Sequence, residues 1–321
     1  MRTDPRIEKT LLLWHQYAGE LGVDPSDFQH DLLWQKNEKW RSHVVLKMDG
    51  PEHAYVIKKK FSGQSIKDGL KAQENAREAI KDHPVASVPK VHFVNDEDQF
   101  CIMDFFDGRP ITSVLEEPSN KNQYLRLMGE FCHALHSGTA LHGERTFQPK
   151  FMMNYIKRVI ARLEAGEWTV AEKSMFLRCA NKIPTFAERF EDQRTHSAQL
   201  HGDLNVRNLL FGENTVAAFD FKPLDFKPVG YDISRLLVDF TELYVTPSDL
   251  QSGRIVPEQV NNSFFESYTF RNPNDPSISF LPFTRLLEDW LQIPTIPAER
   301  SVRQEFRLEN ILQIAEVGFE I

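Results

Sequence analysis

Cysteine is scarce in this sequence, and long apolar runs are missing altogether. The three cysteines, Cys101, Cys132 and Cys179, are odd in number and widely spaced along 321 residues. Because no two of them have the spacing of a metal-binding pair, their scarcity favours a reducing compartment. No stretch reaches the roughly 18 uninterrupted apolar residues that a membrane-spanning helix requires. We therefore expect a cytoplasmic protein that has no membrane partner.

An excess of basic residues is also absent. The chain has 38 Lys and Arg against 46 Asp and Glu, a formal charge of 38 − 46 = −8. This balance disfavours a broad nucleic-acid surface and is compatible with a cationic substrate. The N-terminal segment "MRTDPRIEKTLLLWHQYAGELG" carries charges throughout instead of the apolar core of a secretion signal, so it predicts a helix. The 41% hydrophobic and 26% charged residues are typical of a globular protein, expected as a monomer or a homodimer.

The order of strand and helix patterns divides the chain in two. The first part contains strand patterns at 31–48 (two strands), 54–61, 88–94 and 99–106, and a helix pattern at 65–80. Gly108 and Pro110 then break the last strand, and helix patterns dominate the rest of the chain, among them 121–137 and 149–165. We predict an α+β fold of two lobes. Residues 1–105 would form an N-lobe with a small antiparallel sheet and one helix, and residues 106–321 a mainly helical C-lobe.

A short polar segment, "HGDLNVRN", precedes an apolar run in the second part. Asp203 and Asn208 have the spacing of a kinase catalytic loop, in which the Asp orients and deprotonates a hydroxyl and the Asn binds Mg²⁺. The intervening residues are sufficient to reverse the chain and bring the two side chains together. The alternative is a surface turn whose Asn and Asp side chains cap the local backbone.

A second carboxylate follows at the end of a predicted strand. Asp220, in "TVAAFDF", comes twelve residues after Asn208. Mg²⁺ prefers hard oxygen ligands in near-octahedral geometry, and it keeps phosphate oxygens and water in its shell. Asn208 and Asp220 are therefore the candidate metal ligands, whereas the alternative for Asp220 is an ordinary surface residue at a strand end.

Three motifs together, "LHGDLNVRNLLF", "AAFDF" and "GYDISRLL", resemble the aminoglycoside phosphotransferase and choline kinase family, small-molecule relatives of the protein kinases. The order of the N-terminal strands agrees as well, so the likeness covers most of the chain. It implies a protein-kinase-like fold with Asp203 as the catalytic base and with Asn208 and Asp220 as metal ligands. Asp232 would be a structural residue at a helix start, in keeping with the preference of Asp for N-cap positions.

Nucleotide binding in such an enzyme requires a lysine on the third strand and a helix carboxylate that holds it. The third strand, "AYVIKKK", offers three lysines. Lys58 is favoured because it shares a strand face with Val56, whereas Lys59 would point the opposite way. Lys60 fits only if the register is shifted. Glu74 is the expected partner of the lysine, with Glu78 as the rival.

The glycine-rich loop that usually covers the phosphates is absent. In the corresponding turn, "NEKWRSHV", we expect Ser42 to bind a phosphate and Val44 to face the adenine, although the lack of glycine leaves nucleotide affinity open. Further along, "CIMDFFDG" resembles the segment that links the two lobes. Groups from Asp104 to Phe106 would meet the edge of the adenine there.

The acceptor is expected to be small. Only eight residues, "KPLDFKPV", separate Phe221 from Gly230, too few for the peptide platform of a protein kinase. The resemblance implies transfer of the γ-phosphoryl group of ATP or GTP to a hydroxyl of an aminoglycoside, amino alcohol or sugar. The alternatives are a kinase-like nucleotide-binding protein with weakened catalysis and an atypical protein kinase. The candidates for binding an acceptor amine are Asp239, Glu242, Glu266 and Tyr268.

Overall fold

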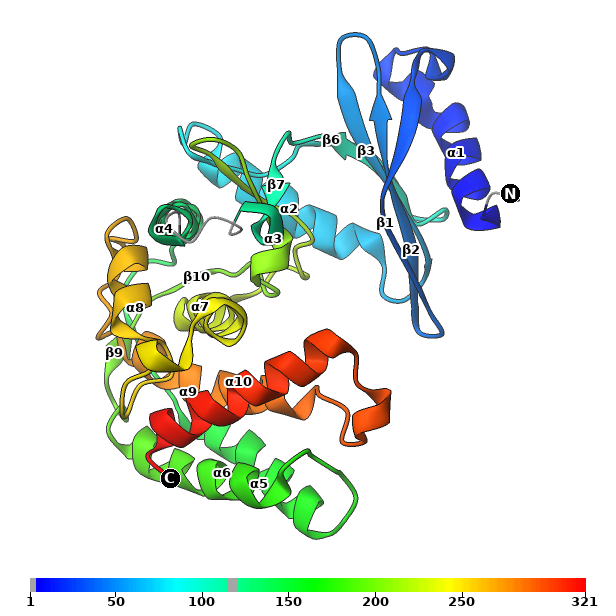
Figure 1. The fold of residues 1–321 in the computed structure, drawn as a ribbon. Helices are drawn as coiled ribbons and strands as arrows, with labels where there is room; N and C mark the ends of the chain where they lie inside the picture. Colours follow the sequence, from blue (N-terminus) through cyan, green and yellow to red (C-terminus); the bar gives the residue numbers. More distant parts are fainter. Residues whose placement is uncertain (1–3, 115–120) are drawn as a thin grey trace. The chain divides into compact units, whose positions relative to one another are not determined.

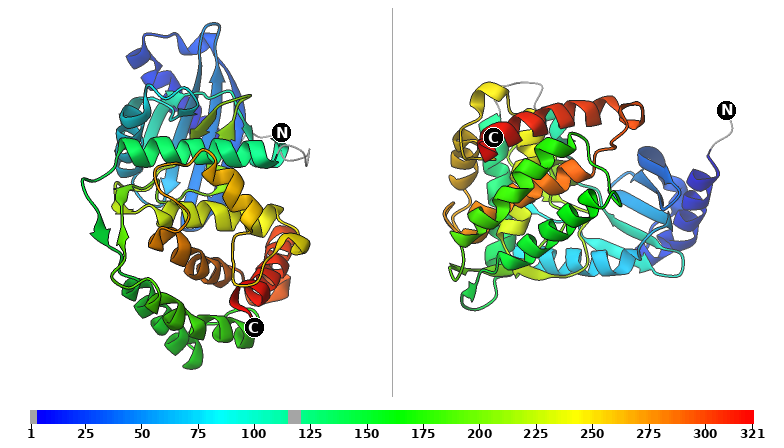
Figure 2. Two further views of the ribbon diagram at one scale, coloured as in Figure 1. Left: turned by 90° about the vertical axis from the view of Figure 1, so that its left-hand side faces the viewer. Right: turned by 90° about the horizontal axis from the view of Figure 1, so that it is seen from below.

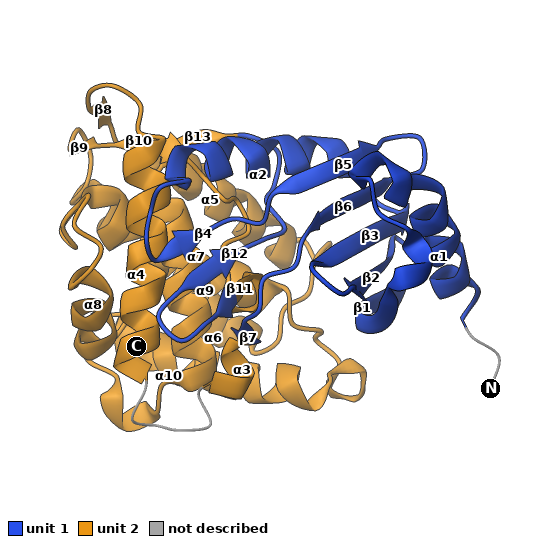
Figure 3. Ribbon diagram, turned by 90° about the horizontal axis from the view of Figure 1, so that it is seen from above, with its two compact units in different colours: residues 1–109, 210–224 blue, residues 110–209, 225–321 orange. Residues whose placement is uncertain are grey.

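The chain forms two compact units. The computed structural model describes residues 4–114 and 121–321. Figure 3 shows the two units in different colours. Unit 1 consists of the residues up to Arg109 together with Leu210–Leu224, and unit 2 of Pro110–Leu209 together with Asp225–Ile321.

This division differs from the predicted domains at two places. The first boundary, predicted after residue 105, lies after Arg109, but residues 210–224 belong to unit 1 and not to the helical part. The reason is strand pairing: β12 (Val216–Ala218) pairs in parallel with β4 (Ala86–Ser87). A segment far along the chain thereby completes a small sheet of unit 1.

A five-stranded antiparallel sheet forms the body of unit 1, in the order β1-β2-β3-β6-β5 (Figure 1). Helix α1 covers one face, where Leu13 and Trp14 pack against Leu46 and Ile57 in the main apolar cluster of the sheet. Ile66 of α2 packs on the other face, in a smaller cluster. The elements are α1 (Pro5–Tyr17), β1 (Gln29–Glu38), β2 (Arg41–Asp49), β3 (Ala54–Ser62), α2 (Ile66–Ile80), β4 (Ala86–Ser87), β5 (Val91–Asn95), β6 (Phe100–Asp104), β7 (Arg109–Pro110), β11 (Leu209–Phe211) and β12.

Helices make up most of unit 2, as two views in Figure 2 show. Helix α7 is buried along almost its whole length, and it packs against α9. At its first residue, Gly230, an added Cβ would lie 2.3 Å from the backbone of Ser277, so only glycine fits this close approach. The elements are α3 (Ile111–Val114), α4 (Lys121–Gly138), β8 (Arg145–Thr146), α5 (Lys150–Glu164), α6 (Lys173–Glu188), β9 (Arg194–Thr195), β10 (Ser197–Gln199), β13 (Phe226–Pro228), α7 (Gly230–Tyr244), α8 (Glu258–Phe265), α9 (Pro276–Leu291) and α10 (Val302–Phe319).

The predicted fold class is confirmed. An antiparallel sheet with helices occupies the N-terminal part, and a mainly helical region follows. The helix patterns at 121–137 and 149–165 correspond to α4 and α5. Among the described residues, the helices are too short or too polar to cross a membrane.

Candidate active site

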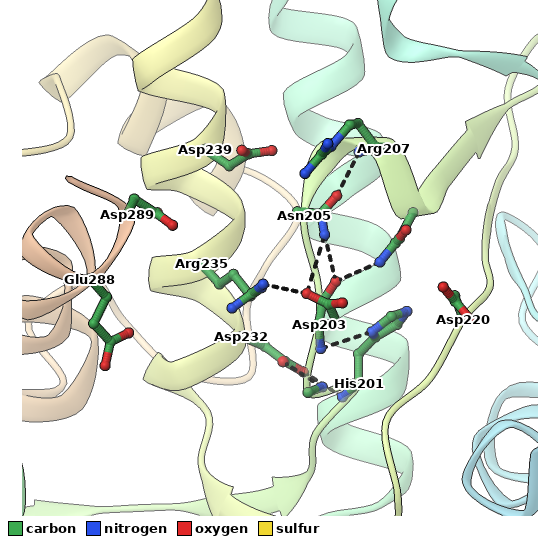
Figure 4. Close-up of polar contacts among 12 residues, drawn as sticks. His201, Asp203, Asn205, Arg207, Asp220, Asp232, Arg235, Asp239, Glu288 and Asp289 are labelled. Atoms are coloured by element: carbon green, nitrogen blue, oxygen red, sulfur yellow. Dashed lines mark hydrogen bonds and ion pairs between the residues drawn. The ribbon is translucent and has the colours of Figure 1, made fainter. Parts of the chain in front are cut away.

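The segment predicted to be the catalytic loop is a tight turn of unit 2 between β10 and β11, and it brings Asp203 and Asn208 together. The amide nitrogens of Asn208 and Asn205 both donate to the backbone carbonyl of Asp203, at 2.8 and 3.0 Å (Figure 4). The Asn205 side chain also accepts from the Arg207 backbone N–H at 3.1 Å, which starts a short 3-10 helix, Val206–Asn208. The predicted chain reversal between Asp203 and Asn208 is therefore present.

Asp232 anchors this segment from helix α7. Its carboxylate accepts the backbone N–H of His201 at 2.7 Å and that of Gly202 at 3.1 Å. Asp232 lies at the start of a helix, as predicted, but in the first turn of α7 and not at its N-cap, which is Val229. Asp232 therefore makes a tertiary contact: its carboxylate accepts the hydrogen bonds of two backbone N–H groups in the turn that contains Asp203.

The anchoring carboxylate of Asp232 is fully buried beside a histidine. The Nε2 of His136, on α4, lies 3.5 Å from its Oδ2, and the Nδ1 of His136 lies 3.1 Å from the hydroxyl of Tyr268. Burial opposes ionisation of Asp232, yet the hydrogen bond and charge of His136 and the neighbouring His201 lower its pKa. The carboxylate thus stays charged as an acceptor for the turn.

Arg235 contacts the proposed base directly. Its Nη2 forms an ion pair with Oδ1 of Asp203, and both side chains are mostly shielded from solvent (Figure 4). Arg235 follows Asp232 by three residues on α7, so the two side chains share a helix face that meets the catalytic turn. Sequence reasoning missed Arg235; the i, i+3 spacing from Asp232 was the signal that pointed to it.

In unit 1, Lys58 pairs with Asp220. The Nζ of Lys58 lies 2.6 Å from Oδ1 of Asp220, and Nη2 of Arg41 lies 3.6 Å from Oδ2 of the same carboxylate. Burial would raise the pKa of Asp220, but Lys58, Arg41 and Lys60 together lower it well below its usual value. Asp220 lies two residues beyond β12 instead of ending the strand, and its φ of 68° is unusual for a residue other than glycine.

The structure distinguishes among the three lysines of β3. Lys58 and Lys60 alternate with Lys59, whose ammonium donates to the backbone carbonyl of Asp98 and is buried. Lys59 therefore faces away from Asp220, as expected. The predicted partner of Lys58, Glu74, accepts the backbone N–H of Val91 at 2.9 Å, so the observed ion pair differs from the predicted one.

Two other residues expected to bind the nucleotide, Val44 and Ser42, have partners within unit 1. Val44 is fully buried in the apolar cluster beneath α1, because it pairs with Lys59, whereas Val45 pairs with Lys58 and shares its face. The hydroxyl of Ser42 accepts from Nη1 of Arg6 at 3.4 Å. The structure thus favours Val45 over Val44 as the valine on the Lys58 face.

The segment predicted to link the lobes borders a cavity of about 480 Å³. Asp104, Phe105 and Phe106 line it together with Tyr55 and with residues near the start of β5. The carboxylate of Asp104 pairs with Nε2 of His92 at 2.6 Å. Lys58 and Asp220 are not among the lining residues, so this cavity is separate from the charged cluster around Asp220.

The four candidates for binding an acceptor amine have other partners. Glu242 is fully buried with Arg307, and burial beside Asp289 raises its pKa well above the usual value. Asp239 shares the same arginine at 3.1 Å, and Tyr268 is buried against His136. Glu266 is exposed and pairs with Arg126. In the same unit, Glu288 of α9 is a partly exposed carboxylate whose pKa is raised by burial, a residue that sequence reasoning missed.

Asn208 and Asp220 suit a magnesium ion by the chemistry of their donor atoms. Among the described residues, three or more His, Cys, Asp or Glu side chains nowhere gather as a metal site. An ion held by one amide oxygen and one carboxylate must take most of its ligands from phosphate and water, which is the habit of Mg²⁺. The amide nitrogen of Asn208 is engaged by the turn, so its oxygen is the atom that can face a cation.

Three solved structures illustrate the fold that this chain shares. Spectinomycin phosphotransferase APH(9)-Ia, in complex with ADP and spectinomycin, aligns with a TM-score of 0.60 at 12% identity, over 98% of this chain and 98% of that one. Amicoumacin kinase hAmiN, in complex with AMP-PNP, Ca²⁺ and Ami, gives 0.56 at 14% identity, over 95% and 93%. A choline/ethanolamine kinase family protein from Mesorhizobium loti gives 0.55 at 13% identity, over 94% and 98%. The class that this fold defines is that of protein-kinase-like phosphotransferases.

The chain itself belongs to the phosphotransferase enzyme family, whose model matches residues 35–253. Comparison with curated proteins gives no match. The family match and the shared fold confirm the predicted family and the prediction of an enzyme, a small-molecule kinase.

Proposed function

We propose that this enzyme transfers the γ-phosphoryl group of ATP or GTP to a hydroxyl of a small molecule, with Asp203 as the base. The observation that carries the proposal is the anchored turn, in which Asp232 fixes two backbone N–H groups next to Asp203 and Asn208 closes the loop. Such rigidity suits a reaction in which positioning and charge neutralisation supply most of the catalysis.

Each residue of the site has a role in this scheme. Asp203 orients the acceptor hydroxyl and takes its proton while the oxygen attacks the γ-phosphorus and the bond to the departing nucleoside diphosphate breaks. Lys58 holds the α and β phosphates. Asn208 and Asp220 would hold Mg²⁺, which neutralises the charge of the triphosphate.

The remaining nucleotide contacts are also proposals. The backbone from Asp104 to Phe106 would contact the purine ring of the nucleotide, and the hydroxyl of Ser42 would donate a hydrogen bond to a phosphate. Glu74 would support Lys58 through its second oxygen, because only Oε1 accepts the Val91 N–H. Val44, predicted at the adenine, is buried beneath α1, which favours Val45 for that role.

A small acceptor suits the short segment after Asp220. This segment contains only the three-residue strand β13 between Asp220 and the start of α7. The solved structures of this fold include complexes with spectinomycin and amicoumacin, which supports an aminoglycoside-like compound, an amino alcohol or a sugar as the acceptor. Glu288 of α9 also has a charged partner, since its Oε2 lies 3.4 Å from Nη1 of Arg285, so we assign no single carboxylate to an acceptor amine.

An acceptor screen tests this function. The purified protein is incubated with MgATP or MgGTP and a panel of amino sugars, amino alcohols and sugars, and nucleoside diphosphate release is followed by a coupled assay. Acceptor-dependent release that disappears in Asp203→Asn supports the proposal. Release that is equal in the wild type and in Asp203→Asn contradicts it.

One observation favours a second candidate, a nucleotide-binding protein with weakened catalysis. The β1–β2 hairpin lacks the glycines that let a backbone approach phosphates closely. This candidate predicts tight MgATP binding without acceptor-dependent turnover in the same screen. An atypical protein kinase would instead label itself or a protein with the γ-phosphate.

A further inference from the structure

Basic side chains of β2 and β3 form a row on one face of the five-stranded sheet. Strand β2 belongs to the β1–β2 hairpin, the turn that lacks glycine. In the register of β2 and β3, His43 lies opposite Lys60, and Val45 lies opposite Lys58. Opposite residues of an antiparallel pair project to the same face, and so do residues two apart on one strand. The register shifts between Ser42 and His43, so alternation alone does not place Arg41. Its ion pair places it, because Nη2 of Arg41 lies 3.6 Å from Oδ2 of Asp220, the carboxylate that also pairs with Lys58.

Two cations of this row share one carboxylate. The ammonium of Lys58 lies 2.6 Å from Oδ1 of Asp220, and the guanidinium of Arg41 lies 3.6 Å from Oδ2. Carboxylate and phosphate oxygens are similar acceptors, and a guanidinium matches both. A pair of cations spaced to reach the two oxygens of one carboxylate is therefore also spaced to reach two oxygens of a phosphate.

The row carries more positive charge than Asp220 balances. Arg41, Lys58 and Lys60 supply three cations, and the ammonium of Lys60 donates to a neutral group, the backbone carbonyl of Gln64, at 3.3 Å. Arg41 and Lys58 contact the same carboxylate, that of Asp220, and the nearest acid across the hairpin from Arg41, Glu38, already pairs with Lys36. Such an excess is expected where a polyanion binds.

We propose that Arg41 is a triphosphate-binding residue that replaces the missing glycine-rich loop. The inference rests on the proposed function and adds a side chain to it. In this hairpin the guanidinium of Arg41 would bind the phosphates, whereas a glycine-rich loop binds them through its backbone N–H groups. With the carboxylate of Asp220 holding a metal ion, Arg41 and Lys58 would bind phosphate oxygens in its place, and Lys60 would add positive charge.

Lys39 offers a matched control in the same hairpin. Its ammonium lies 5.0 Å from the centre of the Trp40 ring, so its partner is the hairpin tip and not Asp220. Arg41→Met and Lys39→Met each remove one positive charge, and the two positions are only two residues apart. A difference between them therefore reports the position of the charge and not the total charge.

Isothermal titration with MgATP, inorganic tripolyphosphate and adenosine tests the inference. Loss of one charge-assisted contact predicts that Arg41→Met weakens MgATP and tripolyphosphate binding about tenfold, while Arg41→Lys loses less and adenosine binding is unchanged. Lys39→Met should bind all three as the wild type does. A thermal melt of each variant checks that the fold is kept.

The outcomes separate this inference from the proposed function. If Lys58→Met loses MgATP affinity but Arg41→Met retains it, Arg41 is not a phosphate ligand and the inference is wrong, while the proposed function stands. If Arg41→Met and Lys39→Met weaken binding equally, the effect is one of general charge and the inference is again wrong. A wild-type chain that binds neither MgATP nor tripolyphosphate overturns both.

Discussion

The carboxylate of Asp232, on the first turn of α7, holds the backbone N–H of His201 at 2.7 Å. The bond joins a buried helix to the start of the catalytic turn, and a second bond to the next N–H, from Gly202, fixes its direction. Asp203 follows immediately, so the orientation of the proposed base depends on a residue that touches no substrate.

Removing this anchor should destabilise the protein and abolish transfer. Asp232→Ala leaves the buried N–H of His201, the N–H of Gly202 and the buried imidazole of His136 without their anionic partner, and we expect the free energy of unfolding to fall by about 3–5 kcal/mol. Urea denaturation measures the loss. The control is Glu266→Ala, which removes an exposed carboxylate and should cost less than about 1 kcal/mol. Equal losses in the two variants would contradict the anchoring role.

The sequence predicted those parts of the fold that local patterns determine. Helix α4, expected at 121–137, runs from Lys121 to Gly138, because apolar residues recur there with helical spacing. The turn from Asp203 to Asn208 was also predictable, because the residues that hydrogen-bond to each other in it are only five positions apart.

Tertiary partners were not predictable in this way. Lys58 meets Asp220, 162 positions away, instead of Glu74, because β12 pairs with β4 and so brings the segment that contains Asp220 into unit 1. The choice between Val44 and Val45 depends on which of them lies opposite Lys58, a register that strand composition does not reveal. Arg235 was not predicted either: its i, i+3 spacing from Asp232 places it on the same face of α7, but only the ion pair with Asp203 shows what that face contacts.

The packing of α1 on the sheet offers a test within a single helix. Trp14 is fully buried in the main apolar cluster of unit 1, whereas Leu12 is 68% exposed. Trp14→Ala should lower the free energy of unfolding by about 3–5 kcal/mol, because it removes buried apolar surface and leaves a cavity. Leu12→Ala should change it by less than about 0.5 kcal/mol. Urea titrations of both variants give the comparison, and a small effect of Trp14→Ala would show that α1 does not pack as described.

His43 should make stability depend on pH. Burial, followed by the charges of Lys58 and Arg41, lowers the pKa of His43 from 6.5 to about 4. As the pH falls from 6.5 towards 4, the unfolded chain binds a proton at this residue that the folded chain does not, so the folded state loses stability. His43→Gln removes this contribution.

The measurement for His43 is the urea midpoint at several pH values. Between pH 6.5 and 4 the wild type should lose more stability than His43→Gln, while above pH 7 the difference between the two should be constant. The other titrating groups are common to both proteins and cancel in the comparison. Parallel curves across the whole range would rule out the lowered pKa of His43.

Asp220 should make nucleotide binding depend on magnesium. In the wild type we expect ATP affinity to rise on addition of Mg²⁺, and in Asp220→Asn this rise should shrink at least tenfold, because one ligand of the ion loses its charge. Asp225→Asn is the control, since Asp225 is an exposed carboxylate that pairs with Lys227. Titration with ATP in Mg²⁺ and in chelator measures the effect, and an unchanged rise in Asp220→Asn would remove Asp220 from the metal site.

The most direct test of the central claim is a transfer assay with γ-labelled ATP and the best acceptor of the screen. Wild type and Asp225→Asn should pass the label to the acceptor at similar rates, whereas Asp203→Asn should bind MgATP normally and transfer at least a hundredfold more slowly, as expected for loss of a general base. Label transfer by Asp203→Asn at the wild-type rate would contradict the assignment of Asp203 as the base.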